Sequence, residues 1–247
     1  MKKCIAALVV AAGVVPAMAQ YDILVIEQGG HPYGDQAIQD LKDLGHNVSV
    51  VQNPLSDYAG YDQVWDMRYS ANMTGDDTTA MGAYLAAGGR MLVLGEHSGF
   101  EGSRNISLRQ WISDVGAGQI GNYVQGCEAN TQDITAEGQI VNSPNSFMSI
   151  KYNCATTYNQ ANIDQGFLVT ATANGDGGII GWDYGDITGA ADARMLAVWD
   201  IEVWETGVNG TKWTEDMATY LGGRVPAPGS FALLGLAGAV AGRRRRA

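Results

Sequence analysis

The sequence is poor in the two residue types that build zinc centres and thiol sites, because it has three cysteines and three histidines among 247 residues. So few cysteines exclude a disulfide-dense scaffold. No histidine lies near Cys127 or Cys154 in the sequence, which argues against a metal or catalytic thiol there. The glycine-bearing loop from Gln28 to Gly34 lacks G-x-G-x-x-G and a P-loop lysine, which argues against a phosphate-binding role for that loop.

Basic residues are also scarce. The chain has 15 lysines and arginines against 26 acidic residues, and only nine of the basic ones fall between residues 20 and 224, where all the acidic ones lie. This segment therefore has a net charge of −17, which argues against nucleic acid and anionic lipid as partners. The charge accounts for solubility and also allows a divalent cation as a cofactor.

Long apolar runs are confined to the two ends of the chain. The N-terminus has two lysines, then an apolar stretch from Cys4 to Val15, then Pro16-Ala17-Met18-Ala19. A positive start, a short apolar run and an Ala-x-Ala site are typical of a secretory signal peptide. We therefore predict a signal peptide at residues 1–19, export through the Sec translocon and cleavage by signal peptidase before Gln20; the alternative is an uncleaved anchor or a buried helix.

The C-terminus combines a proline motif, an apolar run from Phe231 to Gly242 and a terminal arginine cluster. These three parts, in this order, resemble the PEP-CTERM sorting signal, with Ala227 where the commonest motif has glutamate. The resemblance assigns residues 225–247 to a sorting signal with a hydrophobic membrane helix. Its motif residues are Val225, Pro226, Ala227, Pro228, Arg243, Arg244, Arg245 and Arg246.

The resemblance implies cleavage by an exosortase-like membrane protease in a Gram-negative bacterium, with extracellular polysaccharide as a further partner. The arginines would stay on the cytoplasmic side while the preceding domain is exported. The apolar run is barely long enough to span a bilayer, as suits a temporary anchor. We therefore expect a transiently anchored protein that reaches the cell surface or extracellular matrix; the alternative is a permanent single-span anchor.

The cysteine pair predicts a disulfide, because an oxidising compartment favours pairing of Cys127 with Cys154. The bond would close a loop of 26 intervening residues and stabilise the fold by roughly 3 kcal/mol. The surrounding segment, about residues 118–165, is polar and has little apolar periodicity. We expect it to be an insertion into the domain.

Apolar runs alternate with helical spacing along residues 20–224, the expected domain. Four strands are predicted at residues 21–27, 47–51, 63–67 and 90–95, with helices at 35–44, 76–87 and 105–115. Asp76 or Asp77 would cap the second helix. Further strands at 167–172, 178–183 and 194–200 precede a closing helix at 214–221. This alternation predicts one α/β, doubly wound, mostly parallel sheet of the flavodoxin type, with the stapled insertion.

Two segments resemble class I glutamine amidotransferase-like domains. The first is Met81-Gly82-Ala83-Tyr84-Leu85-Ala86-Ala87-Gly88-Gly89-Arg90-Met91-Leu92-Val93-Leu94-Gly95-Glu96, and the second runs from Arg194-Met195-Leu196-Ala197-Val198-Trp199-Asp200 to Tyr220-Leu221-Gly222-Gly223. The resemblance implies a nucleophilic cysteine just past residue 95, but Glu96-His97 stands there. No late His-x-Glu follows, so amidotransferase catalysis is not expected.

Ligands of open α/β sheets bind beyond the carboxyl ends of the strands, at the switch in strand order. The residues expected there are Glu96 and His97 as a catalytic acid/base pair, and Glu27, His31, Asp66, Arg68 and Arg104 as ligand-binding residues. Glu27, Glu96 and His97 could also coordinate a hard cation. The alternative is structural, because carboxylates at strand ends often cap helices or pair with arginine. Among the tryptophans, Trp204 is expected to be the most exposed.

Three hypotheses about function remain open at this point. The first is an exported surface or matrix protein without amidotransferase catalysis. The second is a secreted hydrolase or carbohydrate-active enzyme that uses Glu96 and His97. The third is a cation- or glycan-binding module.

Overall fold

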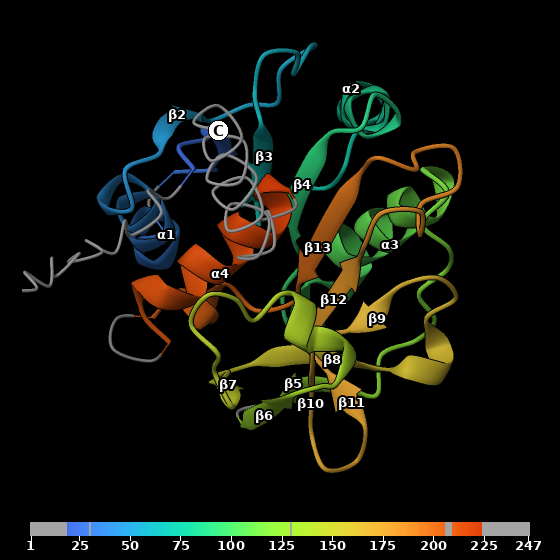
Figure 1. The fold of residues 1–247 in the computed structure, drawn as a ribbon. Helices are drawn as coiled ribbons and strands as arrows, with labels where there is room; N and C mark the ends of the chain where they lie inside the picture. The colour runs from blue at the N-terminus through green and yellow to red at the C-terminus, as the bar shows by residue number, and fades with distance from the viewer. Residues whose placement is uncertain (1–18, 30, 129, 206–208, 224–247) are drawn as a thin grey trace, which may run out of the picture.

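A computed structural model describes residues 19–29, 31–128, 130–205 and 209–223. Its centre is a seven-stranded sheet in the order β2-β1-β3-β4-β13-β12-β9 (Figure 1). The strands are β1 (Asp22–Ile26), β2 (Asn47–Val51), β3 (Gln63–Asp66), β4 (Arg90–Leu94), β9 (Phe167–Leu168), β12 (Ile179–Trp182) and β13 (Arg194–Val198). The strands from β2 to β13 pair in parallel, whereas β12 is antiparallel to both of its neighbours.

Helices cover both faces of this sheet. Successive residues of a strand point to opposite faces, so each strand contributes apolar side chains to two cores. In β1, Ile23 and Val25 pack in one apolar core with α1 (Pro32–Asp43) and α4 (Thr211–Gly222). Leu24 and Ile26 pack in a second core with α2 (Gly75–Ala86) and α3 (Ile106–Asp114). The predicted α/β architecture with a parallel sheet is therefore confirmed, and the four predicted helices are present.

The N-terminus of α2 differs from the prediction. Thr74, not Asp76 or Asp77, is the N-cap, and its side chain accepts a hydrogen bond from the backbone N–H of Asp77. The Asp77 side chain in turn accepts from the backbone N–H of Thr74, which completes a capping box. The helix therefore begins earlier than predicted, because a Thr-x-x-Asp pattern caps as well as a single aspartate does.

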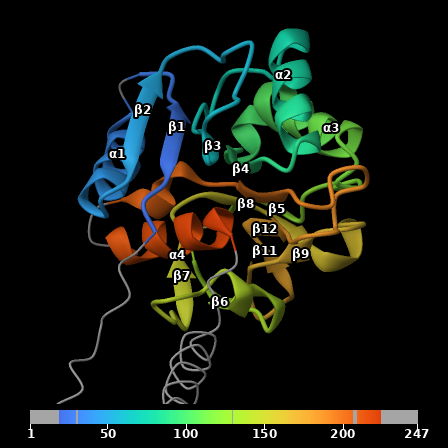
Figure 2. The ribbon, with the colours of Figure 1, turned by 45° about the horizontal axis from the view of Figure 1, so that its top comes forward.

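The segment between α3 and β9 is not a simple loop. It holds β5 (Gln125–Glu128), β6 (Thr131–Ile134), β7 (Ser149–Lys151) and β8 (Ala155–Asn159), and Figures 1 and 2 both place it beside β9 and β12. These strands form two small sheets, β10-β6-β7 and β11-β8-β5, with β10 (Thr170–Ala171) and β11 (Asp176–Gly177). The short helices are η1 (Ser98–Phe100), η2 (Glu101–Asn105), η3 (Glu137–Ile140), η4 (Gln160–Asn162) and η5 (Ile201–Trp204).

The prediction of one continuous strand at residues 167–172 is wrong. It divides into β9, which pairs with β12, and β10, which pairs with β6. The extra layer therefore also uses residues that follow the expected insertion at 118–165. Two-residue strands leave no periodic pattern in a sequence, so only the pairing in space reveals them.

The prediction for Trp204 is also wrong. Its side chain is 3% exposed and lies 6.4 Å, centroid to centroid, from the ring of Trp65 in the core under α1 and α4. The charged neighbours Glu202 and Glu205 suggested exposure, but a short 3-10 helix turns the indole inward.

Both predicted terminal signals lie almost wholly outside the described residues, which begin at residue 19 and end at residue 223. Within the described part of the chain, no helix is both long and apolar enough to cross a membrane.

Candidate functional site at the carboxyl edge of the sheet

The strand order reverses between β1 and β3. Chain order runs outward from β1 to β2, and then returns to the other side of β1 at β3. In open α/β sheets, the loops that leave the strands at such a switch point diverge and frame a ligand site. Glu27 and His31 follow β1, Asp66 ends β3 and Arg68 follows it, and Glu96 and His97 follow β4. The fold therefore brings the predicted residues to one edge of the sheet.

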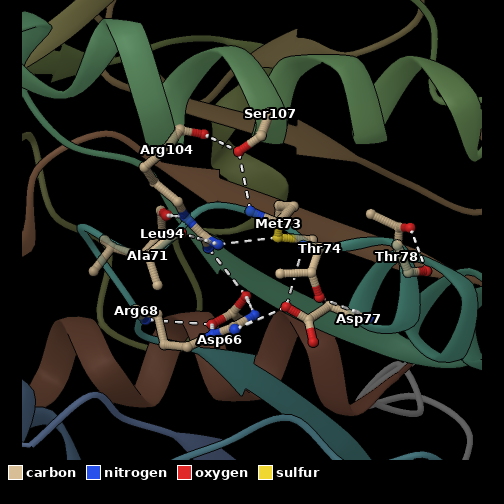
Figure 3. Close-up of polar contacts among 11 residues, drawn as sticks. Asp66, Arg68, Ala71, Met73, Thr74, Asp77, Thr78, Leu94, Arg104 and Ser107 are labelled. Carbon is tan, nitrogen blue, oxygen red and sulfur yellow. Dashed lines mark hydrogen bonds and ion pairs between the residues drawn. The ribbon is translucent and has the colours of Figure 1, made fainter.

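Asp66, Arg68 and Arg104 form one buried charge network. Arg68 Nε lies 2.8 Å from Asp66 Oδ1, and Arg104 Nη2 lies 3.0 Å from Asp66 Oδ2. Arg68 Nη1 extends the network to Asp77 Oδ2 at 3.0 Å. Figure 3 shows Arg104 reaching from η2, just before α3, toward Asp66, with Arg68 and Asp77 on the other side of that carboxylate.

The network has a structural consequence for the loops around it. Arg104 Nε also donates to the carbonyl of Leu94 at 2.8 Å, and Nη1 donates to the carbonyl of Ala71 at 3.2 Å. Burial disfavours the charged form of Asp66, but the two arginines outweigh it and lower the pKa of Asp66. The carboxylate therefore holds β3 and η2 together, and Arg68 links it to the start of α2 through Asp77.

This arrangement bears on three of the predicted ligand-binding residues. Asp66 and Arg104 are 0% exposed, and Arg68 is 4% exposed. Their polar atoms face one another or nearby carbonyls rather than an open surface. For these three residues, the geometry matches the structural alternative, in which a carboxylate at a strand end pairs with arginine.

Glu96 is held by backbone groups. Its Oε1 accepts from the N–H of His97 at 2.9 Å and its Oε2 accepts from the N–H of Ile201 at 3.3 Å. Burial, and then the charge of Asp200, raises the pKa of Glu96 to about 8. The carboxyl group is therefore mainly protonated at neutral pH, and its side chain lies beneath the surface.

The His97 side chain contacts Gly99 and Phe100 rather than the side chain of Glu96. Its Nδ1 accepts a hydrogen bond from the backbone N–H of Gly99 at 3.0 Å, and its ring lies edge-to-face with Phe100 at 5.1 Å. His97 is partly exposed. The two residues predicted as a catalytic pair are thus adjacent in sequence, but the structure gives no hydrogen bond between their side chains.

Asp200 is a residue of this edge that the sequence reasoning placed inside a strand. It follows β13, and its Oδ2 accepts from the backbone N–H groups of Asn153 at 3.0 Å and Cys154 at 3.1 Å. Its Oδ1 accepts from the N–H of Glu202 at 2.8 Å. Aspartate directly after an apolar strand was the signal that could have identified it, because such residues often cap the next helix.

The predicted disulfide is confirmed, with an S–S distance of 2.05 Å between Cys127 and Cys154. It joins the segment of β5 to the start of β8. The hydroxyl of Thr156, in β8, donates to the carbonyl of Glu96 at 2.8 Å. The stapled segment therefore packs against the loops that follow β4 and β13.

Five aromatic rings form a continuous row across the loops after β1, β3 and β4. Ring centroids are 5.1 Å apart between His31 and Tyr33, 4.8 Å between His31 and Tyr69, and 5.8 Å between Tyr69 and Phe100. Phe100 then contacts His97. All five side chains are partly exposed. Only the histidines were anticipated, because the tyrosines and the phenylalanine are brought together by tertiary contacts alone.

Glu27 lies between β1 and α1, in the segment that also carries His31. Its Oε2 accepts from the backbone N–H of Gly29 at 2.8 Å, and its side chain is 6% exposed. Gly34 leaves room for this side chain, since a Cβ there would lie 3.2 Å from Glu27 Oε1, a tight contact. Glu27 therefore fixes the loop that carries His31.

No group of three or more His, Cys, Asp or Glu side chains in the described residues has the arrangement to hold a metal ion. Glu27, Glu96 and His97 therefore do not form a hard-cation site there. A groove of about 370 Å³ lies elsewhere, between α2 and α3, and Thr78, Trp111 and Thr188 are among the residues that line it. It is separate from the aromatic row.

The described fold is similar to several solved structures. The N-terminal domain of mmIFT52 has a TM-score of 0.60 at 9% identity, over 83% of this chain and 98% of that one. A GMP synthase-like protein from Thermoplasma acidophilum has a TM-score of 0.51 at 13% identity, over 82% and 94% of the two chains. A ThuA-like protein from Bacteroides uniformis has a TM-score of 0.53 at 12% identity, over 81% and 89%.

The chain has a glutamine amidotransferase-like fold. Identities this low show the fold alone and transfer no activity. No family model matches the sequence, and no curated protein matches it. The resemblance carried by residues 81–96 and 194–223 thus holds at the level of the fold.

Proposed function

We propose that this protein is an exported, surface- or matrix-associated binding protein that uses an amidotransferase-like fold without amidotransferase catalysis. The observation that carries the second part is chemical: Glu96 and His97 follow β4, where the resemblance implies a cysteine nucleophile. The two cysteines of the described residues, Cys127 and Cys154, are joined in a disulfide, so neither offers a thiolate.

The sequence supports the first part of the proposal. An N-terminal signal at residues 1–19 and a tail at 225–247 that resembles a PEP-CTERM signal argue for export, transient anchoring and release by an exosortase-like protease. A disulfide in the domain is compatible with an oxidising compartment. The partner in the matrix would be a polymer such as extracellular polysaccharide.

Cell fractionation tests the sorting part. We expect the full chain to be found at the cell surface or in the matrix, and a chain that ends at residue 224 to be released into the medium. A variant with lysine at positions 243–246 tests whether sorting requires the positive charge or the arginine side chain itself, because it keeps the positive cluster while removing arginine. Equal release of the full and truncated chains would contradict the proposal.

A hydrolase is the second candidate, favoured by one observation. A carboxyl group with a pKa of about 8 can donate a proton at neutral pH, as a general acid must. However, both oxygens of Glu96 accept from backbone N–H groups, and the side chain is only 4% exposed. Hydrolysis of a polysaccharide panel that is lost in Glu96→Gln but kept in His46→Gln would support the enzyme over the binding protein.

A further inference from the structure

The aromatic row lies at the place where this fold class binds ligands. His31 follows β1 and Tyr69 follows β3, so their contact at 4.8 Å bridges the switch point between those strands. Tyr33 extends the row over α1, while Phe100 and His97 extend it to the loop after β4. Tyr33 and Tyr69 pack against the core on one side, and all five side chains are partly exposed, so the row also presents aromatic surface at this position.

Carboxylates flank the row at one end. The short helix η5, which carries Glu202, packs against α1, which carries Tyr33. Burial, and then the charges of Glu205, Glu202 and Asp200, raise the pKa of the Tyr33 hydroxyl. Among the described residues, no ion pair includes Glu202, Glu205 or Asp200. The carboxylates of Glu202 and Glu205 are therefore not neutralised by an arginine or lysine of the described chain, whereas Asp200 is buried and accepts three backbone hydrogen bonds.

The positive groups closest in sequence to the row are already compensated. Arg68 and Arg104 are buried and paired with Asp66 and Asp77 on the inner side of the same loops. Burial lowers the pKa of His31, so its imidazole is mainly neutral at pH 7 and does not repel a cation. The row thus combines the faces of aromatic rings with negatively charged side chains near Tyr33.

This combination selects for one ligand class. The faces of aromatic rings carry negative partial charge and attract cations, most strongly those that lose little hydration, such as alkylammonium groups. A hard divalent cation would need several oxygen ligands, and the described residues hold no such group. An acidic protein surface also raises the local concentration of cations.

We propose that the row formed by His31, Tyr33, Tyr69, Phe100 and His97 binds an alkylammonium group, carried by a small molecule or by a matrix polymer. The inference rests on the binding role proposed above and names the ligand class of that role. The alkyl substituents pack against the rings, and the charge faces the carboxylates beside Tyr33. No covalent step is involved.

Binding of choline to the purified full-length chain tests the proposal, with 3,3-dimethylbutan-1-ol as the neutral molecule of the same shape. Proton NMR of the ligand is the readout, because contact with ring faces shifts the N-methyl signal upfield. We expect saturable binding of choline and no saturable binding of the alcohol. Binding of ethanolamine as well would extend the site to primary ammonium groups and also support the proposal.

Variants locate the site. Tyr69→Leu removes a central ring and should weaken choline binding roughly three- to ten-fold, in line with the size of cation–π contacts. Tyr69→Phe keeps the ring and should bind like the parent, which guards against loss through misfolding. Tyr61→Leu is the matched control, since Tyr61 is a partly exposed tyrosine that lies just before β3 at its opposite end.

Three results would overturn the proposal: equal binding of choline and its neutral analogue, no choline binding by a folded chain, or equal weakening by Tyr69→Leu and Tyr61→Leu. Displacement of bound choline by a neutral oligosaccharide, in a chain that binds choline and 3,3-dimethylbutan-1-ol equally, would likewise reject the alkylammonium class. Because these measurements use purified protein, they do not depend on sorting. Failure of sorting with intact choline binding would therefore reject the export proposal alone.

Discussion

Asp200 and Cys154 are joined across 46 positions of sequence by a hydrogen bond of 3.1 Å from the Cys154 N–H to the Asp200 Oδ2. The same carboxylate accepts from the N–H groups of Asn153 and Glu202. One side chain thus ends β13, begins η5 and anchors the disulfide-bearing segment to the sheet. The stability of the carboxyl edge should depend on it.

Asp200→Ala should lower the free energy of unfolding by about 2 kcal/mol or more, because buried N–H groups lose their acceptor. Urea unfolding of the full chain measures the change. Asp200→Asn keeps one acceptor oxygen and should cost less. A stability of the alanine variant equal to that of the parent would show that these hydrogen bonds contribute nothing net.

Removal of the disulfide should cost roughly 3 kcal/mol, because the bond closes a loop whose ends are 27 positions apart. The double variant Cys127→Ser/Cys154→Ser should unfold at lower urea concentration than the oxidised parent. Reductant should shift the parent and leave the double variant unchanged. If reductant shifts both equally, its effect does not come from this bond.

Breaking the buried network should be among the more costly single changes. Arg104→Met leaves Asp66 with one arginine and removes a donor from two carbonyls, so a loss of about 3–5 kcal/mol is expected. Arg109→Met in α3 is the control, because Arg109 is only partly buried. A double-mutant cycle with Asp66→Asn isolates the pair energy, and an additive cycle would contradict direct coupling.

The pH dependence of this network follows from the lowered pKa of Asp66. A depressed folded-state pKa gives stability that is fully present above the unfolded value of about 3.9 and is lost as the pH falls further. The stability difference between the parent and Asp66→Asn should therefore shrink below about pH 4. Unfolding at a series of pH values measures it, and a constant difference across the acid range would reject this origin.

The contribution of Glu96 to the pH dependence of stability has the opposite sign. Its folded pKa of about 8 lies above the unfolded value of about 4.3, so the folded state holds a proton that the unfolded state has lost. Stability should therefore fall as the pH rises from about 5 to 8, by an amount on the order of a few kcal/mol. Glu96→Gln should flatten this slope, whereas the variant Glu137→Gln, at an exposed site, should keep it. An unchanged slope in Glu96→Gln would rule out this residue as the source.

Much of the fold could be predicted from local pattern. The run that became β1 alternates Ile23 and Val25 with Leu24 and Ile26, and both sets are apolar because helices cover both faces. The four main helices had clear spacing and stops. Polar strands such as β6 and two-residue strands such as β10 have no such signal, so the extra layer was predicted only as an insertion.

The candidate site was predictable only in part. Residues at strand ends could be named, and Glu27, Asp66 and Glu96 do lie at the carboxyl edge. Whether these side chains are open to a ligand could not be predicted, because the pairing of Asp66 with Arg104 depends on the placement of η2 relative to β3. Asp200 was missed because its three hydrogen-bond donors come from segments far from it in sequence as well as near it.

The sequence by itself determined the acidic charge, the cysteine pair, the order of the main strands and the four helices, and the Glu96-His97 pair where the resemblance implies a cysteine, because these depend on composition and local periodicity. Only the tertiary structure decided which charged groups form ion pairs in the Asp66 network and which rings contact one another at the switch point. His31, Tyr69 and Phe100 come from three separate loops. Their contact depends on the parallel pairing of β1, β3 and β4, which no local pattern encodes.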